Sequence, residues 1–299
     1  MTNAGLSDKS YKKSLQLIQE LRLPAHFIDL IYRIYYPLAT KITDYIDTRP
    51  LLVSLNGAQG TGKTTLSNFL KMILEHEFHL HTVILSLDDF YLSQQQRVEL
   101  AKQIHPLLVT RGVPGTHNLQ QLKEVLELLK SGRPCFIPRF NKAVDNPFPD
   151  SAWQSCKQPV DVILFEGWCN NSPVMTTEQL RAPINELEEL EDKQGIWRSY
   201  SNEQLAQYHR YVFNHTDLLL MLKAPDFEQV YGWRQQQEEH LFKHNDSEAT
   251  NSIMNAAELR RFIMHFERIT RHDLEHLAAH ADIILPLSAA HDISQIIIT

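Results

Sequence analysis

The feature that most constrains the fold is a short glycine-rich segment. Residues 57–64 read G-A-Q-G-T-G-K-T, which fits the phosphate-binding pattern G-x-x-x-x-G-K-[ST] at every position. Glycine is scarce elsewhere, since the whole chain has 10 glycines in 299 residues. Three of them lie in this one segment: Gly57, Gly60 and Gly62. The backbone there needs torsions or a close approach that only glycine allows.

Each residue type in this loop has a chemical task. The glycines let successive backbone N–H groups converge on phosphate oxygens, and the following helix adds the partial positive charge of its N-terminus. Lys63 is expected to neutralise the β- and γ-phosphates of ATP, and the hydroxyl of Thr64 is a hard ligand that suits Mg²⁺. We predict that the nucleotide is bound by Gly57, Ala58, Gln59, Gly60, Thr61, Gly62, Lys63, Thr64 and Thr65.

Hydrophobic periodicity predicts an α/β fold. Short apolar runs indicate five strands, at 51–55, 82–87, 160–165, 218–222 and 282–285, with a weaker sixth at 135–137. Helical patterns lie between them, at 63–77, 118–130, 202–214, 226–242 and 256–279. Strands and helices that alternate in this way form a mainly parallel sheet with helices on both faces. Together with the phosphate loop, this order predicts the P-loop NTPase fold.

Other segments suggest how the chain is organised. Residues 1–48 carry two helical patterns and are predicted to be an N-terminal helical extension of the P-loop domain, residues 49–299. Residues 138–159 are rich in Pro, Asn and Asp and are predicted to be a long loop that contacts the substrate. Residues 226–280 are predicted to form a helical lid. The run 186–192 holds five acids and is interpreted as a solvated surface.

Composition excludes several classes of protein. Apolar residues make up 43% of the chain, which is enough for a sizeable core and excludes a mainly disordered protein. A net charge of -7 disfavours a protein that binds nucleic acid through its phosphates. The three cysteines have no paired spacing, and the sequence shows no apolar signal segment, so we expect a cytoplasmic protein. It also shows no apolar run of membrane length, so we expect no contact with a membrane. A homo-oligomer is left open.

Carboxylates follow two of the predicted strands. Asp88 and Asp89 come directly after the run 82–87, and Glu166 comes directly after the run 160–165. In open parallel sheets ligands bind outside the carboxyl ends of the strands, so these acids are expected to lie near the nucleotide. One of the aspartates could accept the proton of an attacking hydroxyl while the other, or the same one, contacts the metal. The predicted metal site is therefore Thr64, Glu166, Asp88 and Asp89.

The chain resembles the superfamily of uridine kinase, phosphoribulokinase and pantothenate kinase. After the phosphate loop, the resemblance rests on S-L-D-D-F-Y (86–91), R-G-V-P-G-T-H (111–117) and F-E-G-W (165–168). Within the superfamily it is most similar to the glycerate kinase group. That similarity rests on P-R-F-N-K (138–142), P-I-N-E-L-E (183–188), G-I-W-R-S-Y (195–200), A-P-D-F (224–227) and W-R-Q-Q-Q-E (233–238).

The resemblance implies roles for individual residues. It makes Asp88 the catalytic base, with Asp89 a weaker second, and it makes Arg234 a lid cation that acts with Lys63 on the transferred phosphate. It also implies that the acceptor is bound by Arg111, His117 and Arg139. A carboxylate acceptor suits a bidentate guanidinium, which favours the two arginines for that task. The remaining histidines are interpreted as surface or core-packing residues.

The expected function is phosphate transfer from ATP to a hydroxyl of a small metabolite, with D-glycerate as the leading acceptor. Many relatives carry G-R-G-D-R after P-R-[FY]-[ND]-K, whereas this chain reads A-V-D-N-P-F-P-D. Either another residue binds the acceptor or the acceptor differs, so a pantothenate- or nucleoside-type kinase stays open, as does a non-catalytic ATP-binding regulatory protein. A GTPase is disfavoured because N-K-A-V-D (141–145) is one residue too long for N-K-x-D.

Overall fold

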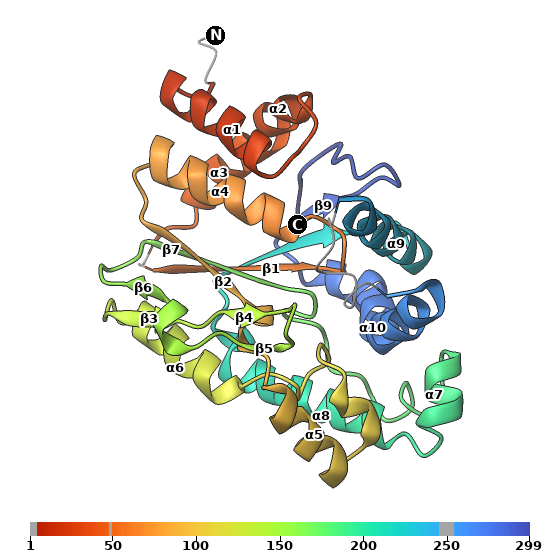
Figure 1. The fold of residues 1–299 in the computed structure, drawn as a ribbon. Coiled ribbons are helices and arrows are strands. Elements are labelled where there is room, and N and C mark those ends of the chain that lie inside the picture. The colour runs from red at the N-terminus through yellow and green to blue at the C-terminus, as the bar shows by residue number, and fades with distance from the viewer. Residues whose placement is uncertain (1–4, 48–49, 245–253) are drawn as a thin grey trace.

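The computed structural model describes residues 5–47, 50–244 and 254–299 and shows a central sheet between two layers of helices (Figure 1). Six strands form this sheet in the order β10-β9-β8-β1-β7-β2. Their bounds are β1 Leu51–Gly57, β2 Thr82–Ser86, β7 Val162–Gly167, β8 Leu218–Lys223, β9 Ile283–Pro286 and β10 Ile297–Ile298. All neighbouring pairs are parallel except β9 and β10. The five predicted strands and the mainly parallel sheet are confirmed.

Two small antiparallel sheets interrupt the segment that was predicted to be a long loop. Residues Cys135–Ile137 form β3, as predicted, but they pair with β6 (Gln154–Cys156) and not with the main sheet. Inside that pair lies a tight hairpin of β4 (Phe140–Asn141) and β5 (Asn146–Pro147). The prediction that 138–159 is a loop throughout was therefore wrong, whereas its predicted contact with the substrate stays a prediction. The strands are only two or three residues long, so their periodicity is too short to read.

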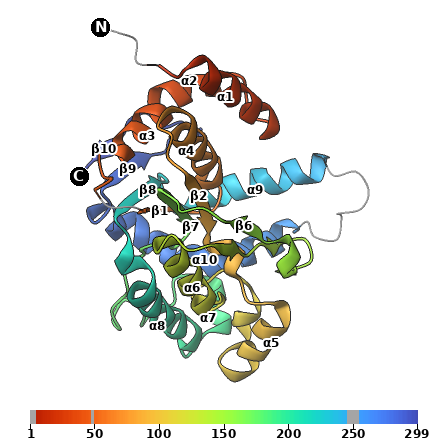
Figure 2. The same ribbon diagram turned by 90° about the vertical axis from the view of Figure 1, so that its left-hand side faces the viewer.

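Helices cover both faces of the sheet. Their bounds are α1 Asp8–Glu20, α2 Phe27–Leu30, α3 Tyr36–Thr43, α4 Lys63–Glu77, α5 Gln94–Gln103, α6 Leu119–Lys130, α7 Glu186–Glu191, α8 Ile196–Tyr211, α9 Phe227–His244 and α10 Ala256–His276. Figure 2 shows α1 to α4 on one side of the sheet and α6, α8 and α10 on the other. Helix α4 has the predicted bounds, whereas α8 begins six residues before its predicted start and ends three before its predicted end. Among the described residues, no helix is long and apolar enough to cross a membrane.

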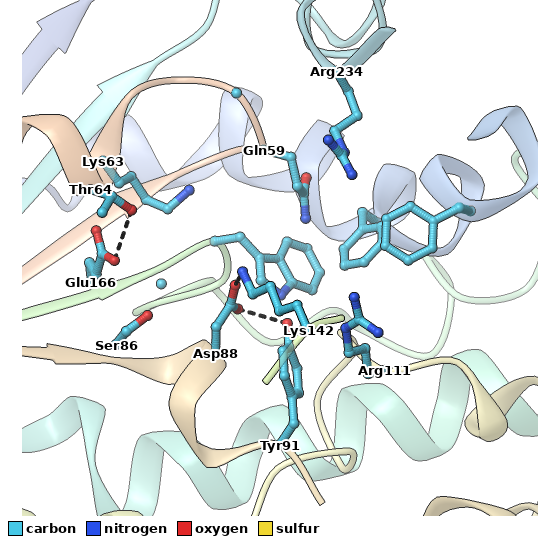
Figure 3. Close-up of a pocket in the computed structure, with 15 residues that line it drawn as sticks. Gln59, Lys63, Thr64, Ser86, Asp88, Tyr91, Arg111, Lys142, Glu166 and Arg234 are labelled. Atoms are coloured by element: carbon cyan, nitrogen blue, oxygen red, sulfur yellow. Dashed lines mark hydrogen bonds and ion pairs between the residues drawn. The ribbon is translucent and has the colours of Figure 1, made fainter. Parts of the chain in front are cut away.

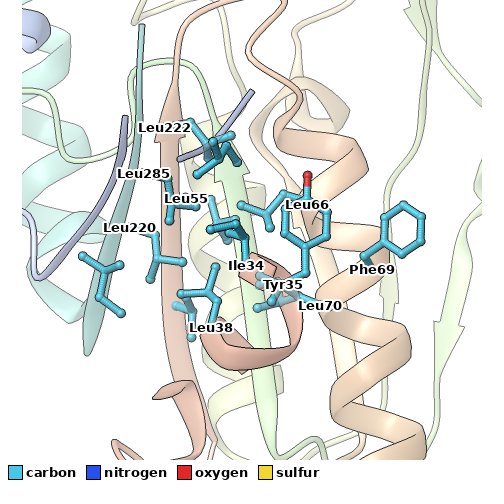
Figure 4. Close-up of a cluster of buried hydrophobic side chains, with 14 of the residues drawn as sticks. Ile34, Tyr35, Leu38, Leu55, Leu66, Phe69, Leu70, Leu220, Leu222 and Leu285 are labelled. Atoms are coloured by element: carbon cyan, nitrogen blue, oxygen red, sulfur yellow. The ribbon is translucent and has the colours of Figure 1, made fainter. Parts of the chain in front are cut away.

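The N-terminal helices share the core of the P-loop domain. Figure 4 shows side chains of Ile34, Tyr35 and Leu38 packed between strand residues such as Leu55 and the α4 residue Phe69. Leu38 and Leu55 are fully buried in this cluster. A separate cluster fills the opposite face, because successive residues of β1 point to opposite sides of the sheet. Removing the extension would therefore expose one face of the core.

The acidic run at 186–192 is only partly a solvated surface. Glu188 is fully buried and accepts hydrogen bonds from Arg268 on α10, including one of 2.7 Å from Nε. Asp192 is also buried and pairs with Arg198 on α8 at 3.0 Å. The interpretation of this run as a solvated face was wrong for these two residues. Buried carboxylates need such partners. Arg268 lies 80 residues from Glu188 in sequence and gives no local signal of the pairing, whereas Arg198 lies only six residues from Asp192.

Candidate active site

The phosphate loop connects β1 to α4 in a strained but glycine-compatible conformation. Gly60 and Gly62 have φ values of +82° and +88°, which L-residues with side chains rarely adopt. A Cβ on Gly60 would also lie 3.0 Å from the Cβ of Trp233. Lys63 Nζ donates to the backbone carbonyls of Gly57 and Ala58, at 2.6 and 3.0 Å. These two hydrogen bonds hold the ammonium group of Lys63 against the backbone of the loop.

A cavity of about 250 Å³ lies beside this loop, at the carboxyl ends of β1, β2 and β7 (Figure 3). Six charged side chains line it: Lys63, Asp88, Arg111, Lys142, Glu166 and Arg234. Part of its wall is apolar and is formed by Trp168, Phe262 and Phe266. The ring centroids of Trp168 and Phe266 lie 4.9 Å apart. The expectation that the strand ends converge on one site is met for Asp88 and Glu166.

Glu166 is the strand-end carboxylate closest to the loop. Its Oε1 accepts from the hydroxyl of Thr64 at 3.0 Å, and its Oε2 accepts from the hydroxyl of Ser67 at 3.3 Å. Burial raises the pKa of Glu166 above its usual range, although Lys63 and the two hydroxyls oppose that shift. A cation beside the Thr64 and Glu166 oxygens would favour the ionised carboxylate.

Asp88 is held by two partners. The Tyr91 hydroxyl donates to its Oδ1 at 2.7 Å, and Lys142 Nζ donates to its Oδ2 at 2.6 Å (Figure 3). Burial on its own would raise the pKa of Asp88, but Lys142, Tyr91 and Lys63 outweigh burial and lower this pKa to about 2. Asp88 is therefore ionised at neutral pH and presents a carboxylate to the cavity.

Asp89 and Arg139 contact each other outside the residues that line this cavity. Arg139 Nη1 donates to Asp89 Oδ2 at 2.6 Å, and the backbone N–H of Phe140 donates to Asp89 Oδ1 at 3.1 Å. Burial raises the pKa of Asp89, and Arg139 opposes that shift. Both residues anchor the β4–β5 hairpin. Their predicted roles, in metal binding and in acceptor binding, stay predictions.

The other three residues predicted from the resemblance lie at different depths. Arg111 and Arg234 line the cavity, and Arg111 Nη1 donates to Asp145 Oδ1 at 2.5 Å. His117 is buried behind Tyr91, on which its ring stacks with centroids 4.6 Å apart. Its Nδ1 lies 2.8 Å from the hydroxyl of Tyr208, and burial lowers its pKa to about 3. His117 therefore contacts Tyr91, which lines the cavity, but does not line the cavity itself, and its predicted role in acceptor binding stays a prediction.

Sequence reasoning gave no role to three polar residues that line the cavity, Ser86, Tyr91 and Lys142. Lys142 was quoted within P-R-F-N-K, and Tyr91 within S-L-D-D-F-Y, without a role for either. Gln59 was predicted to bind the nucleotide, and its Oε1 is buried in this region with no hydrogen-bond partner among the described residues. Figure 3 shows the Gln59 side chain directed at the cavity. A buried acceptor without a partner is expected where a ligand supplies the donor.

Within the described ranges, no three His, Cys, Asp or Glu residues cluster closely enough to hold a metal ion by themselves. Magnesium, however, commonly takes one or two protein oxygens and completes its shell with water and substrate phosphates. The Thr64 hydroxyl and the Glu166 carboxylate are oxygen donors of this kind. The site therefore fits a magnesium ion that arrives with a nucleotide.

The fold and the site define a P-loop small-molecule kinase. The sequence matches the Phosphoribulokinase / Uridine kinase family over residues 52–198, and the chain belongs to this family. It is 32% identical to the chloroplastic D-glycerate 3-kinase of Arabidopsis thaliana over 67% of this chain, but spans only 43% of that relative. It is 31% identical to the uncharacterized kinase mug58 of Schizosaccharomyces pombe, over 73% of this chain and 79% of the relative.

A solved structure supports the fold independently of the sequence. The D-glycerate 3-kinase of Cryptococcus neoformans var. grubii superposes with a TM-score of 0.73. The superposition covers 89% of this chain and 99% of the other, at 21% sequence identity. At that identity the likeness shows a shared fold, so the acceptor has to be argued from the residues of this site.

Proposed function

We propose that the protein transfers the γ-phosphate of ATP to the 3-hydroxyl of D-glycerate and releases 3-phosphoglycerate. The observation that carries this proposal is the charge pattern of the 250 Å³ cavity. Four basic side chains and two carboxylates line it: Lys63, Arg111, Lys142 and Arg234, with Asp88 and Glu166. The excess of positive charge suits an acceptor that is itself an anion, in addition to the terminal phosphate.

The nucleotide end of the site would be formed by the phosphate loop. Its backbone N–H groups and the N-terminus of α4 would bind the phosphates, and Lys63 would turn from the loop carbonyls to the β- and γ-phosphates. Thr64 and Glu166 would hold Mg²⁺, directly or through water. Magnesium held there would supply positive charge that stabilises the negative charge developing on the transferred phosphate.

At the acceptor end, Asp88 would orient the attacking hydroxyl and accept its proton. Its low pKa keeps it ionised, and in phosphoryl transfer the proton moves late, so a strongly basic group is not required. Lys142 now occupies the Oδ2 of Asp88, so the acceptor hydroxyl would compete for that oxygen. Most of the rate acceleration would come from positioning and electrostatics.

The carboxylate of glycerate would be bound by Arg111, with Arg234 closing over the transferred group. Asp145 fixes one nitrogen of the Arg111 guanidinium and leaves further donors for a ligand. Asp145 belongs to the segment that replaces the G-R-G-D-R of many relatives. That segment would therefore contribute by orienting Arg111 in place of supplying an arginine of its own.

The cellular setting follows from the cysteines. All three, Cys135, Cys156 and Cys169, are buried free thiols. Free buried thiols are typical of a reducing compartment such as the cytoplasm. We propose that the reaction takes place there.

The test is a coupled measurement of ADP release with a panel of acceptors. D-Glycerate is compared with glycerol, which lacks the carboxylate, with glycolate, which lacks the second hydroxyl, and with pantothenate and uridine. We expect the highest kcat/KM for D-glycerate, with 3-phosphoglycerate as the product by mass spectrometry. Glycerol should be poorer by about 100-fold or more, because the basic side chains are left without their anion. A stronger signal with pantothenate or uridine would contradict the proposal.

A further inference from the structure

Arg97, on α5, is fully buried and lies outside the residues that line the active-site cavity. A guanidinium is not deprotonated inside proteins, so a buried arginine requires an opposite charge and hydrogen-bond acceptors. Both are present around Arg97, and they connect it to the acceptor end of the active site.

The guanidinium of Arg97 joins three segments of the chain. Its Nη1 donates to the carbonyl oxygen of Leu92 at 2.5 Å, just before α5, and its Nε donates to that of Val109 at 3.1 Å. Its Nη2 donates to Oδ2 of Asp145, in the turn between β4 and β5. Val109 comes two residues before Arg111 in the sequence. Arg97 therefore holds both the backbone that leads to Arg111 and the carboxylate that contacts Arg111.

Asp145 is shared between two guanidinium groups. Its Oδ2 accepts from Arg97, and its Oδ1 accepts from Arg111 Nη1 at 2.5 Å. The backbone of Asp145 has a φ of +54°, in the left-handed region that residues with side chains rarely adopt. Two charge-assisted hydrogen bonds help to stabilise this conformation. Because each oxygen has its own arginine, loss of the Arg97 contact would let the carboxylate turn and would change how it orients Arg111.

We propose that Arg97 is a positioning residue for the acceptor: through Asp145 it fixes the orientation of Arg111, and it thereby strengthens the preference for an acceptor that carries a carboxylate. The inference rests on the proposed function in that Arg111 binds the carboxylate of the acceptor. It does not require that the acceptor is D-glycerate, because any hydroxy acid presents the same group.

The charges of these three residues support this role. Two guanidiniums share one carboxylate, which leaves one positive charge in excess. The side chain of Arg97 has no exposed surface, whereas that of Arg111 is 26% exposed and lines the cavity. With Arg111 as its only partner, Asp145 would cancel the charge that attracts an anion. Because Arg97 also pairs with Asp145, the excess charge lies at Arg111, where a carboxylate can bind it.

A second contact limits the size of the expected effect. The guanidinium of Arg111 lies over the ring of Phe140, 5.9 Å from its centroid. The Phe140 ring in turn packs edge-to-face against Tyr91, with centroids 5.2 Å apart. These contacts would keep Arg111 near the cavity after its link to Arg97 is disturbed. We therefore expect weaker binding of the acceptor and not a complete loss of activity.

The test compares Arg97→Lys with the wild type on acceptors with and without a carboxylate. Lysine keeps the positive charge, but its single ammonium group cannot reproduce the fork that reaches three separate acceptors. D-Glycerate and glycerol are titrated at saturating ATP, and ATP is titrated at saturating D-glycerate. We expect the KM for D-glycerate to rise about tenfold. The kcat/KM for glycerol and the KM for ATP should stay unchanged, because neither ligand uses the carboxylate contact of Arg111.

Arg198→Lys is the matched control. Arg198 is also buried and pairs with an aspartate, Asp192, at 3.0 Å, and neither residue lines the active-site cavity. This control disturbs a comparable buried ion pair, and we expect it to leave the KM for D-glycerate unchanged. The same selective rise is therefore not expected from a general weakening of the fold.

Asp145→Glu tests the same link from its other end. The side chain of Asp145 is 31% exposed, so the substitution keeps the charge that Arg97 needs without filling a closed core. One added methylene moves the carboxylate relative to Arg111, so the KM for D-glycerate should again rise while the kcat/KM for glycerol stays unchanged. This variant decides the inference if Arg97→Lys does not fold.

Two results would overturn the inference: an unchanged KM for D-glycerate in Arg97→Lys, or an equal loss with D-glycerate and glycerol. If D-glycerate is phosphorylated by the wild type, either result makes the inference fail alone. If the wild type prefers pantothenate, the proposed function fails, and the inference then predicts a higher KM for pantothenate, which also carries a carboxylate. If it prefers uridine, both fail, because that acceptor has no carboxylate.

Discussion

Lys142 Nζ lies 2.6 Å from Asp88 Oδ2, and this contact ties the β4–β5 hairpin to the carboxylate at the end of β2. The adjacent Asp89 binds the other end of β4 through Arg139, also at 2.6 Å. Two consecutive acids thus hold two basic residues of one P-R-F-N-K segment. Only the first of these ion pairs lines the active-site cavity. Placement of the hairpin and protonation of Asp88 are therefore linked.

Replacing Lys142 should change the pH dependence of the reaction. Burial raises the pKa of Asp88, and Lys142 is the largest effect that lowers this pKa to about 2. In Lys142→Met the pKa of Asp88 should rise, so the acid limb of kcat should move to higher pH. Because the pKa of Asp88 is lowered in the folded state, its ionised form stabilises the fold at pH values above its unfolded pKa, and this stabilisation is lost as pH falls toward 2. Lys142→Met should reduce this contribution to the free energy of unfolding.

The measurement is kcat against pH for the wild type, Lys142→Met and the control Lys157→Met, whose exposed side chain follows β6 and does not line the cavity. An acid limb in the same place for all three proteins would contradict the role of Lys142.

Replacing Glu166 should raise the requirement for magnesium. Glu166 is 5% exposed, and its carboxylate accepts a hydrogen bond from Thr64, another predicted magnesium ligand. In Glu166→Gln the concentration of Mg²⁺ for half-maximal activity should rise about 10- to 100-fold. The measurement is a magnesium titration at saturating ATP, with the surface variant Glu178→Gln as control. A normal titration for Glu166→Gln would show that this carboxylate does not serve the metal.

Asp273 should make the fold less stable as pH rises. It is fully buried on α10 and accepts from Ser172 at 2.6 Å and from Asn56 at 3.2 Å, while its Oδ1 has no partner in the described part of the chain. Burial raises its pKa from 3.8 to about 7. Between these two pKa values the folded state holds a proton that the unfolded state releases. The free energy of unfolding should therefore fall as pH rises from 3.8 to about 7.

In Asp273→Asn this pH-dependent loss should disappear. An amide keeps an oxygen for Ser172 and carries no charge, so at pH 8 the variant should unfold at a higher urea concentration than the wild type. The expected gain is on the order of 1–3 kcal/mol. The measurement is urea unfolding at pH 5 and pH 8. A variant that is less stable than the wild type at pH 8 would contradict the assignment.

The N-terminal helices should behave as part of the main core in unfolding experiments. Leu38 of α3 is fully buried against β1 and α4, whereas Leu15 of α1 is 37% exposed. Leu38→Ala should lower the free energy of unfolding by about 2–5 kcal/mol in one cooperative transition. Leu15→Ala should cost about 0.5 kcal/mol or less. A small loss confined to a separate, early transition would show that the extension folds independently.

The parts of the fold predicted from the sequence are those with long periodic signals. Helix α4 was predicted with its observed bounds because the phosphate loop precedes it and a fifteen-residue amphipathic pattern begins at Lys63. The buried strands were found because both of their faces are apolar. Strand β10 was missed: it has two residues and pairs antiparallel at the sheet edge, so its placement depends on β9 and not on its own pattern.

The sequence predicted those parts of the site that lie at the ends of strands or in the phosphate-loop motif. Asp88 and Glu166 were identified because parallel strands place their carboxyl ends at one edge of the sheet. Which of two adjacent aspartates faces the cavity depends on Arg139 and Lys142, about 50 residues further along the chain. The apolar wall of Phe262 and Phe266 comes from one face of α10. On the sequence those rings cannot be told from core residues.

The most direct test of the central claim is a rapid-quench measurement of γ-phosphoryl transfer to D-glycerate by the wild type and Asp88→Asn, with the Kd for ATP measured in parallel. If Asp88 receives the proton of the acceptor hydroxyl, the variant should transfer phosphate about 10²- to 10⁴-fold more slowly while binding ATP with unchanged affinity. A variant that transfers phosphate at the wild-type rate would contradict the claim.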